Sequence, residues 1–253
     1  MTTSCSPQVS ETETLSLSSE NQHIIKVMKE FILGYDIRFH HKAGDEGHIS
    51  KEERDEVLLN PEVEWPLSVD TFVWPSIFMY EDEGDVYQYQ NEESIYLKTR
   101  NIQQERFYLW QDFDEMTKSI NYIDILERNV GIPIAISVHL SEEQIKGYAF
   151  NETFWSRIKT SSLFGKTLSG RWKLIGYDVA DDVLRSGLSA LHFGGFNQEE
   201  KPEIVKEWAH FLNEHGLFIE LDGAMRFAEF MDKLEPGHAP FYAFGLYGIN
   251  EKN

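Results

Sequence analysis

The sequence has a single cysteine, Cys5, among 253 residues. A disulfide within the chain is therefore excluded, and so is a zinc site built from several thiolates. No hydrophobic run approaches the roughly 18 residues that a membrane-spanning helix needs. The opening segment, MTTSCSPQVSETETLSLSSEN, has neither a basic region nor a long apolar one, as a secretory signal would. We therefore expect a reduced, cytoplasmic protein.

Basic residues are scarce as well. There are 23 Lys and Arg against 43 Asp and Glu, which gives a net charge of −20. This excess repels nucleic-acid phosphates and anionic lipid surfaces, so we expect neither direct nucleic-acid binding nor membrane contact. It attracts positively charged proteins and speeds their association. An acidic surface that only keeps the protein soluble is the alternative interpretation.

Motifs of common active sites are also missing. SGLS at 186–189 lacks the G-x-S-x-G pattern of a nucleophile elbow, and GKTLSG at 165–170 lacks the upstream glycine of a phosphate-binding loop. The segment HHKAGDEGH offers imidazole and carboxylate ligands, but their spacing matches no helix-borne zinc motif, and we expect a polar surface loop. Its potential ligands are His40, His41, Asp45 and His48. We predict no catalytic residue, no metal and no cofactor.

The composition, 41% hydrophobic and 13% aromatic, is that of a globular protein. Residues 1–18 are rich in Ser and Thr and predict a disordered tail, and we expect a single domain over 19–253. Hydrophobic periodicity and turn residues predict the secondary structure. The expected helices are 24–32 (ending near Gly34), 50–59, 112–129, a short one capped by Ser141, 201–216 and 221–234. The expected strands are 71–80, 94–100, 133–140, 172–179, 188–193 and 240–249.

The order of these elements bears on the fold class. Helices and strands are mixed rather than strictly alternating, and no internal repeat at a fixed period is visible. This order favours an α+β fold, in which a mixed or antiparallel sheet of about five to seven strands packs with helices.

The acidic residues are concentrated in one segment. Fifteen acidic and two basic residues lie between Asp45 and Glu93, a net charge of −13, with aromatic residues interleaved. Like charges at this density repel one another and oppose folding, so they suggest a binding function, and a partner rich in Arg or Lys would fit them. The alternative is a solvated acidic face over an aromatic core. The predicted partner-binding residues are Asp45, Glu46, Glu52, Glu53, Asp55, Glu56, Glu62, Glu64, Trp65, Glu81, Asp82, Glu83 and Asp85.

Residues 175–189, IGYDVADDVLRSGLS, place three carboxylates at the end of a predicted buried strand. They are Asp178, Asp181 and Asp182. Because side chains alternate along a strand, Asp178 should point away from Tyr177 and Val179. Turn and capping roles are one interpretation of the three acids, and partner contact is another. A third is a metal-dependent or acid–base hydrolase that uses Asp178 and Asp182.

Three segments of the C-terminal third resemble acidic bacterial immunity proteins that accompany polymorphic or contact-dependent toxins. They are GRWKLIGYDVADDVLRSGLSAL (170–191), KEWAHFLNEHGLF (206–218) and HAPFYAFGLYGI (238–249). The resemblance covers residues 165–250 and includes no contact motif. It implies a cytoplasmic, non-enzymatic protein that inhibits a cognate toxin stoichiometrically, and a basic toxin such as a nuclease would suit the charge. A DNA mimic that blocks a nucleic-acid-binding protein is a further alternative.

Overall fold

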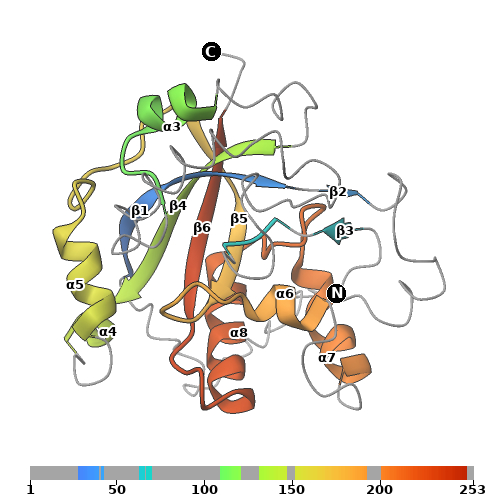
Figure 1. Ribbon diagram of the computed structural model, residues 1–253. Coiled ribbons are helices and arrows are strands. Elements are labelled where there is room, and N and C mark those ends of the chain that lie inside the picture. Colours follow the sequence, from blue (N-terminus) through green and yellow to red (C-terminus); the bar gives the residue numbers. More distant parts are fainter. Residues whose placement is uncertain are drawn as a thin grey trace, which may run out of the picture.

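A computed structural model describes residues 28–39, 41–42, 63–65, 67–69, 109–120, 131–146, 152–192 and 201–249. Its centre is a four-stranded antiparallel sheet in the order β1-β4-β6-β5 (Figure 1). The strands are β1 (Met28–Phe39), β4 (Gly131–Ser141), β5 (Trp172–Ala180) and β6 (Tyr242–Ile249). A separate pair joins β2 (His41–Lys42) to β3 (Val63–Trp65).

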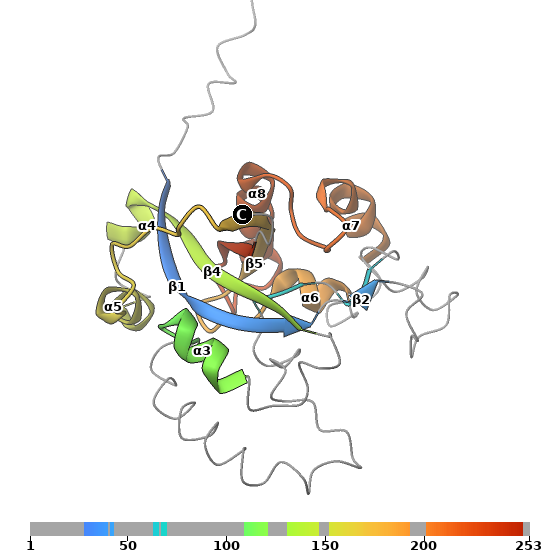
Figure 2. The same ribbon diagram turned by 90° about the horizontal axis from the view of Figure 1, so that it is seen from above.

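Helices lie on both sides of this sheet, and Figure 2 shows α3 and α8 on opposite sides of it. The helices are α3 (Phe113–Ile120), α4 (Glu142–Lys146), α5 (Glu152–Thr160), α6 (Gly187–His192), α7 (Lys201–Trp208), the 3-10 turn η5 (Ala209–Phe211) and α8 (Leu221–Leu234). Within the described ranges, no helix has the length and apolar character needed to cross a membrane.

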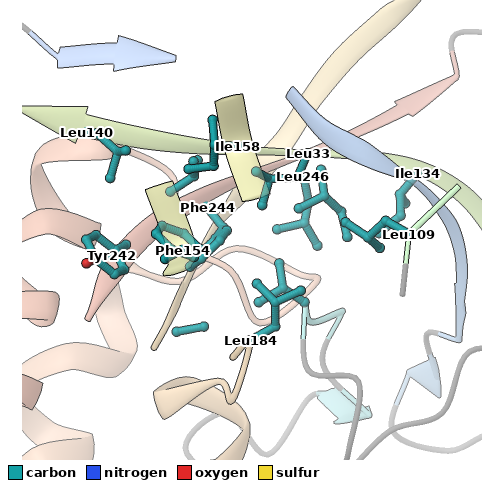
Figure 3. Close-up of a cluster of buried hydrophobic side chains, with 14 of the residues drawn as sticks. Leu33, Leu109, Ile134, Leu140, Phe154, Ile158, Leu184, Tyr242, Phe244 and Leu246 are labelled. Carbon is teal, nitrogen blue, oxygen red and sulfur yellow. The ribbon is translucent and has the colours of Figure 1, made fainter. Parts of the chain in front are cut away.

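Each face of the sheet buries its own apolar cluster. On one face, Ile134 of β4 and Phe244 of β6 pack in a cluster with Phe154 and Ile158 of α5 (Figure 3). The second cluster joins Val179 and Ala243 to α6, α7 and α8 on the other face. Residues that alternate along β5 and β6 therefore enter different cores, as the period of two in a strand requires.

Both edge strands contain the same short motif, which we call the GYD motif. It reads LGYD at 33–36 in β1 and IGYD at 175–178 in β5. In each strand a β-bulge precedes the tyrosine, and the tyrosine exchanges two backbone hydrogen bonds with a residue outside the sheet. Tyr35 pairs in this way with Trp110 at 2.8 and 2.9 Å, and Tyr177 pairs with Phe218 at 2.9 Å.

An amide side chain completes each GYD motif. The side-chain nitrogen of Gln111 donates to the carbonyl oxygen of Leu33 at 2.8 Å. The side-chain nitrogen of Asn213 donates in the same way to that of Ile175, also at 2.8 Å. The glycines are required because the covering segments lie directly over them. A Cβ on Gly34 would lie 2.5 Å from the Cβ of Leu109, and one on Gly176 would lie 2.7 Å from the Cβ of Leu217.

The two GYD motifs are related by an approximate two-fold axis through the centre of the sheet. The register places Tyr35 opposite Ala135 of β4 and Tyr177 opposite Gly245 of β6. Ala135 comes one residue before Ile136, Gly245 comes one residue before Leu246, and Ile136 and Leu246 pair with each other. Because the axis relates β1 to β5 and β4 to β6, both motifs occupy equivalent positions at the two edges. Only three consecutive residues repeat in the sequence, so the repeat escapes a search for a fixed period.

The predicted α+β class is confirmed, whereas the predicted five to seven strands are not. The described residues form one sheet of four strands and the separate β2–β3 pair. The strands predicted at 133–140, 172–179 and 240–249 correspond to β4, β5 and β6, and the helix predicted at 221–234 is α8. Helix 112–129 is confirmed over α3. The tail at 1–18 and the elements expected at 50–59, 71–80 and 94–100 lie outside the described residues, and the single domain stays a prediction.

The cap at the end of β4 has the predicted form. The amide nitrogen of Gln144 donates to Oγ of Ser141 at 3.1 Å, and that of Ser141 donates to Oε1 of Gln144 at 2.8 Å. This reciprocal pair is a capping box, and it starts α4 directly after the strand.

Three predicted elements are wrong. Residues 28–32, expected at the end of a helix, belong to β1, because pairing with β4 along the strand overrides the local apolar spacing. Residues 188–192, expected in a strand, lie in α6, where Ser186 caps the helix by accepting the amide of Ser189 at 3.0 Å. The helix expected over 201–216 ends at Phe211. Beyond it, Oδ1 of Asn213 accepts the amides of two later residues and turns the chain.

We predict that Gly176→Ala destabilises the protein by about 1–3 kcal/mol, the usual cost of overpacking. The new methyl group would lie 2.9 Å from the side-chain nitrogen of Asn213 and 3.0 Å from the carbonyl oxygen of Phe218, and the latter cannot move away easily. Urea denaturation followed by circular dichroism would measure the change. Gly170→Ala is the matched control, because a Cβ at Gly170 meets no atom within 4 Å. Equal unfolding midpoints for the two variants would contradict the prediction.

Candidate functional site

Asp178 belongs to β5, within the IGYDVADDVLRSGLS stretch, and is fully buried. Its carboxylate accepts four hydrogen bonds. Oδ2 accepts from Oγ of Ser68 at 2.9 Å and from the amide of Val69 at 2.8 Å. Oδ1 accepts from Oγ of Ser186 and from the amide of Val179, both at 2.7 Å. One carboxylate thus joins β5 to the 67–69 segment and to the start of α6.

Burial dominates the electrostatics of this carboxylate. It raises the pKa of Asp178 from 3.8 to about 6, although the four hydrogen-bond donors act in the opposite direction. A carboxylate that is enclosed on all sides and engaged by four donors has no open access to a substrate. These contacts are therefore those of a structural residue, despite the shifted pKa that often marks an active site.

The GYD motif of β1 also contacts the 67–69 segment. Asp36 forms a buried ion pair with Arg38 at 3.0 Å, and a guanidinium nitrogen of Arg38 donates to the carbonyl oxygen of Val69 at 3.3 Å. The amide of Val69 is bound to Asp178. The aspartates of both motifs therefore act on one peptide segment, Asp178 directly and Asp36 through Arg38.

Asp181 organises the turn that follows β5. Its buried carboxylate accepts the amides of Val183 at 3.0 Å and Arg185 at 2.9 Å, and it pairs with the Arg185 guanidinium at 2.7 Å. Within this turn Leu184 has a φ of +63°, a left-handed conformation that costs a non-glycine residue about 1–2 kcal/mol. The side chain of Leu184 is buried in the first core. This is the turn role that one interpretation of the sequence predicts for Asp181.

Asp182, the third acid of the stretch, is less enclosed than its neighbours. Burial, followed by the negative charge of Asp181, raises its pKa. Asp178 precedes the Asp181 turn and Asp182 lies within it, and no contact between their carboxylates supports a shared proton or a shared ligand. The geometry thus gives no support to a hydrolytic pair.

A different polar cluster lies on the opposite face of the sheet, and we call it the Glu30 cluster. It consists of Glu30 from β1, Ser137 and His139 from β4 and Tyr247 from β6. Oε1 of Glu30 accepts hydrogen bonds from Oγ of Ser137 at 2.7 Å and from the Tyr247 hydroxyl, and it lies 3.7 Å from Nε2 of His139. Gly245 permits this convergence, since a Cβ there would lie 2.8 Å from Oγ of Ser137.

The protonation of the Glu30 cluster follows from its burial. Burial lowers the pKa of His139, with the charge of Glu30 opposing it, so the imidazole is neutral near pH 7. Burial and the bond to Glu30 raise the pKa of Tyr247, so the phenol keeps its proton. The cluster thus presents a held, partly exposed carboxylate beside a neutral imidazole, and such groups can bind a hydrogen-bond donor that carries positive charge.

The described residues contain little of the predicted partner surface. Glu64 and Trp65 lie in β3, where Trp65 pairs with His41 of β2. The other eleven predicted contact residues, from Asp45 to Asp85, lie outside the described residues. So do His40, Asp45 and His48 of the HHKAGDEGH segment. Within the part of the chain that the structure describes, no three His, Cys, Asp or Glu side chains are placed to hold a metal ion.

The sequence interpretation missed the Glu30 cluster, although a signal was present. In the strand GIPIAISVHLS, the residues at 137, 139 and 141 are Ser, His and Ser, so every second position is polar over the second half of the strand. Polar residues on one face of a buried strand indicate a face that the core does not fully cover. The partner residues Glu30 and Tyr247 could not be identified in this way, because they come from strands distant in the chain.

We predict that Asp178 makes stability depend on pH in a defined direction. Since its pKa is raised from 3.8 to about 6 on folding, the folded chain binds more protons than the unfolded chain between these values. The free energy of unfolding should therefore fall as pH rises through this range, by about 3 kcal/mol in total for this group. Asp178→Asn removes this contribution, so the difference between wild type and variant should shrink by that amount from pH 4 to pH 7.

Chemical denaturation of both proteins at several pH values would measure this difference. Asp114→Asn, which changes an exposed aspartate on α3, is the control, and its difference from wild type should stay nearly constant. A difference for Asp178→Asn that does not change with pH would contradict the prediction.

Comparison with known proteins identifies no relative of this chain. No known protein family matches the chain, and neither a curated protein nor a solved structure matches it. The function must therefore be inferred from the chain's own charge, contacts and site geometry.

Proposed function

We propose that this protein is a cytoplasmic immunity protein that binds a basic bacterial toxin, such as a nuclease, and neutralises it by stoichiometric inhibition. The observation that carries the proposal is the charge. The chain has a net charge of −20, and −13 of it lies between Asp45 and Glu93. A surface of this kind is suited to a basic protein, and the resemblance of residues 165–250 to immunity proteins points in the same direction.

The polar groups of the described residues are consistent with a binding protein. Asp178 and Asp181 are buried and hold the 67–69 segment and the turn after β5. A hydrolase that uses Asp178 and Asp182 would need at least one of them open to a substrate and next to a base. Asp178 is enclosed by four donors, so this alternative lacks the access that its chemistry requires.

The charge also sets the expected kinetics of binding. Opposite net charges raise the association rate through long-range attraction, and added salt screens this attraction. Aromatic residues such as Trp65 would contribute mainly to slow dissociation. A DNA mimic would show a similar salt dependence, but it would bind many nucleic-acid-binding proteins, whereas an immunity protein is expected to bind one cognate toxin.

We predict that the purified protein forms a saturable one-to-one complex with the toxin encoded beside it. Replacing Glu81, Asp82, Glu83 and Asp85 by their amides should weaken the complex by about tenfold or more at low salt, mainly through slower association. Surface plasmon resonance at several salt concentrations would measure both rates. Absence of a saturable complex at low salt would refute the proposed function.

A matched control separates local contacts from the overall charge. Amide replacement of Asp114, Glu115, Glu203 and Glu207, which are exposed on α3 and α7, removes the same number of charges. This control should change the association rate by less than about threefold, because the removed charges lie outside the acidic segment. Equal losses in both variants would show that net charge, and not the 81–85 segment, governs binding.

A further inference from the structure

The sheet face that carries the Glu30 cluster has exposed apolar side chains at its β5 edge. Paired residues of an antiparallel sheet point to the same side, so the register places Leu174 of β5 beside Tyr247 of β6 on this face. Leu174 is 40% exposed. Ile219, which follows the residue bonded to Tyr177, is 53% exposed. Tyrosines flanked by exposed apolar side chains are typical of a protein contact surface.

The carboxylate of Glu30 is held on this face, but only one of its oxygens is engaged. Oε1 accepts from Oγ of Ser137 at 2.7 Å and from the Tyr247 hydroxyl. Oε2 makes no hydrogen bond to the part of the chain that the structure describes, and the Glu30 side chain is 41% exposed. Oε2 is therefore a positioned acceptor that a partner can reach.

No described residue cancels the charge of Glu30. The neighbouring Lys29 pairs with Glu142 at 3.4 Å, and no other described lysine or arginine pairs with Glu30. Nε2 of His139 lies 3.7 Å from Oε1 of Glu30, too far for a hydrogen bond. Burial lowers the pKa of His139 although the charge of Glu30 opposes this, so the imidazole is neutral near pH 7. The negative charge of Glu30 is thus left for a partner.

Two tyrosine hydroxyls lie near this carboxylate. The Tyr247 hydroxyl donates its proton to Glu30, so its oxygen can still accept. The Tyr177 ring packs edge-on against the imidazole of His139, with 5.4 Å between the ring centroids, and its hydroxyl makes no hydrogen bond within the described ranges. Burial, followed by the charges of Glu30 and Glu220, raises the pKa of Tyr177, as expected for a phenol close to both carboxylates.

This set of acceptors selects a primary ammonium group. The ammonium of lysine has three N–H donors on one nitrogen, one for Oε2 of Glu30 and one for each hydroxyl. A guanidinium binds a carboxylate best through two parallel hydrogen bonds, but Oε1 of Glu30 already accepts two. The methylene groups of a lysine can pack on Leu174, and the faces of the tyrosine rings attract its charge.

We propose that Glu30, Tyr177 and Tyr247 bind the ammonium group of a lysine side chain on the basic partner protein. This inference rests on the proposed function for the identity of the partner, and it places one contact within the described residues. The ammonium donates to Oε2 of Glu30 and to the two hydroxyls, and Leu174 packs on the methylene groups. Because Oε2 is exposed in the free protein, the sheet needs no rearrangement to bind.

The first test uses N-acetyl-lysine amide as the probe and NMR amide shifts of the full chain as the readout. We expect saturable shifts at Glu30, Tyr177 and Tyr247. The same probe with an acetylated side-chain nitrogen carries no charge and should bind about tenfold more weakly. Non-saturable shifts, or equal binding of the two probes, would overturn the inference. Stronger binding of N-acetyl-arginine amide would overturn the choice of lysine.

Two substitutions test the residues while keeping the sheet intact. Glu30→Gln retains an oxygen that can accept from Ser137 and Tyr247, and it should weaken probe binding about tenfold. Tyr177→Phe removes a hydroxyl without a hydrogen bond in the described structure, so it should weaken binding about threefold and leave the unfolding midpoint unchanged. Glu207→Gln, on the exposed side of α7, is the control for the lost charge.

Either of two results with these variants would contradict the site. Equal losses for Glu30→Gln and Glu207→Gln would show that general charge binds the probe. Wild-type binding by Tyr177→Phe would refute the set of three acceptors.

The same variants separate this inference from the proposed function. If the toxin complex forms and Glu30→Gln weakens it about tenfold while Glu207→Gln does not, both proposals are supported. If the complex forms and Glu30→Gln binds the toxin as tightly as wild type does, the lysine contact is refuted and the proposed function stands. If the probe binds but no toxin complex forms, the proposed function fails and the ammonium site stands.

Discussion

The described structure depends on the burial of one carboxylate, that of Asp178. Its four donors come from the 67–69 segment, from β5 and from the start of α6, so a segment more than 100 residues away in sequence meets the β5–α6 stretch at two oxygen atoms. Each buried donor left without an acceptor would cost about 1–3 kcal/mol, and the loss would be shared among all three parts. Leu67 and Val69 enter the first core only while this segment is held against the sheet.

The two GYD motifs act together on the 67–69 segment. One aspartate binds the amide of Val69, and the other acts through Arg38 on the carbonyl oxygen of the same residue. Both polar groups of one buried peptide segment are therefore satisfied by charged side chains that the two-fold relation of the motifs brings to the same place. The turn at Asp181 and the cap at Ser186 follow directly, so the stretch from β5 to α6 is built as one continuous unit.

Local signals in the sequence predicted the later part of the fold better than the earlier part. Strands β4, β5 and β6 are apolar runs bounded by turns, and α8 has a clear apolar face, so their own residues identify them. Residues 28–32 carry apolar side chains whose spacing fits a helix as well as a strand. Only their pairing with the distant strand β4 makes them a strand. The role of Asp178 could not be read locally, because two of its donors lie more than 100 residues away. The Glu30 cluster is hidden for the same reason, although His139 on the polar face of β4 was visible.

The covered edges of the sheet restrict how any partner can approach. At Tyr35 and Tyr177 the outward backbone groups are already bonded to Trp110 and Phe218, and the bulges interrupt the ladder beside them. An incoming strand would find no continuous row of free donors and acceptors at these positions, so β-augmentation is blocked there. At these positions a partner must then be recognised through side chains. Such a mode lets contact residues change to follow a new partner while the hydrogen-bonded frame of the sheet stays the same.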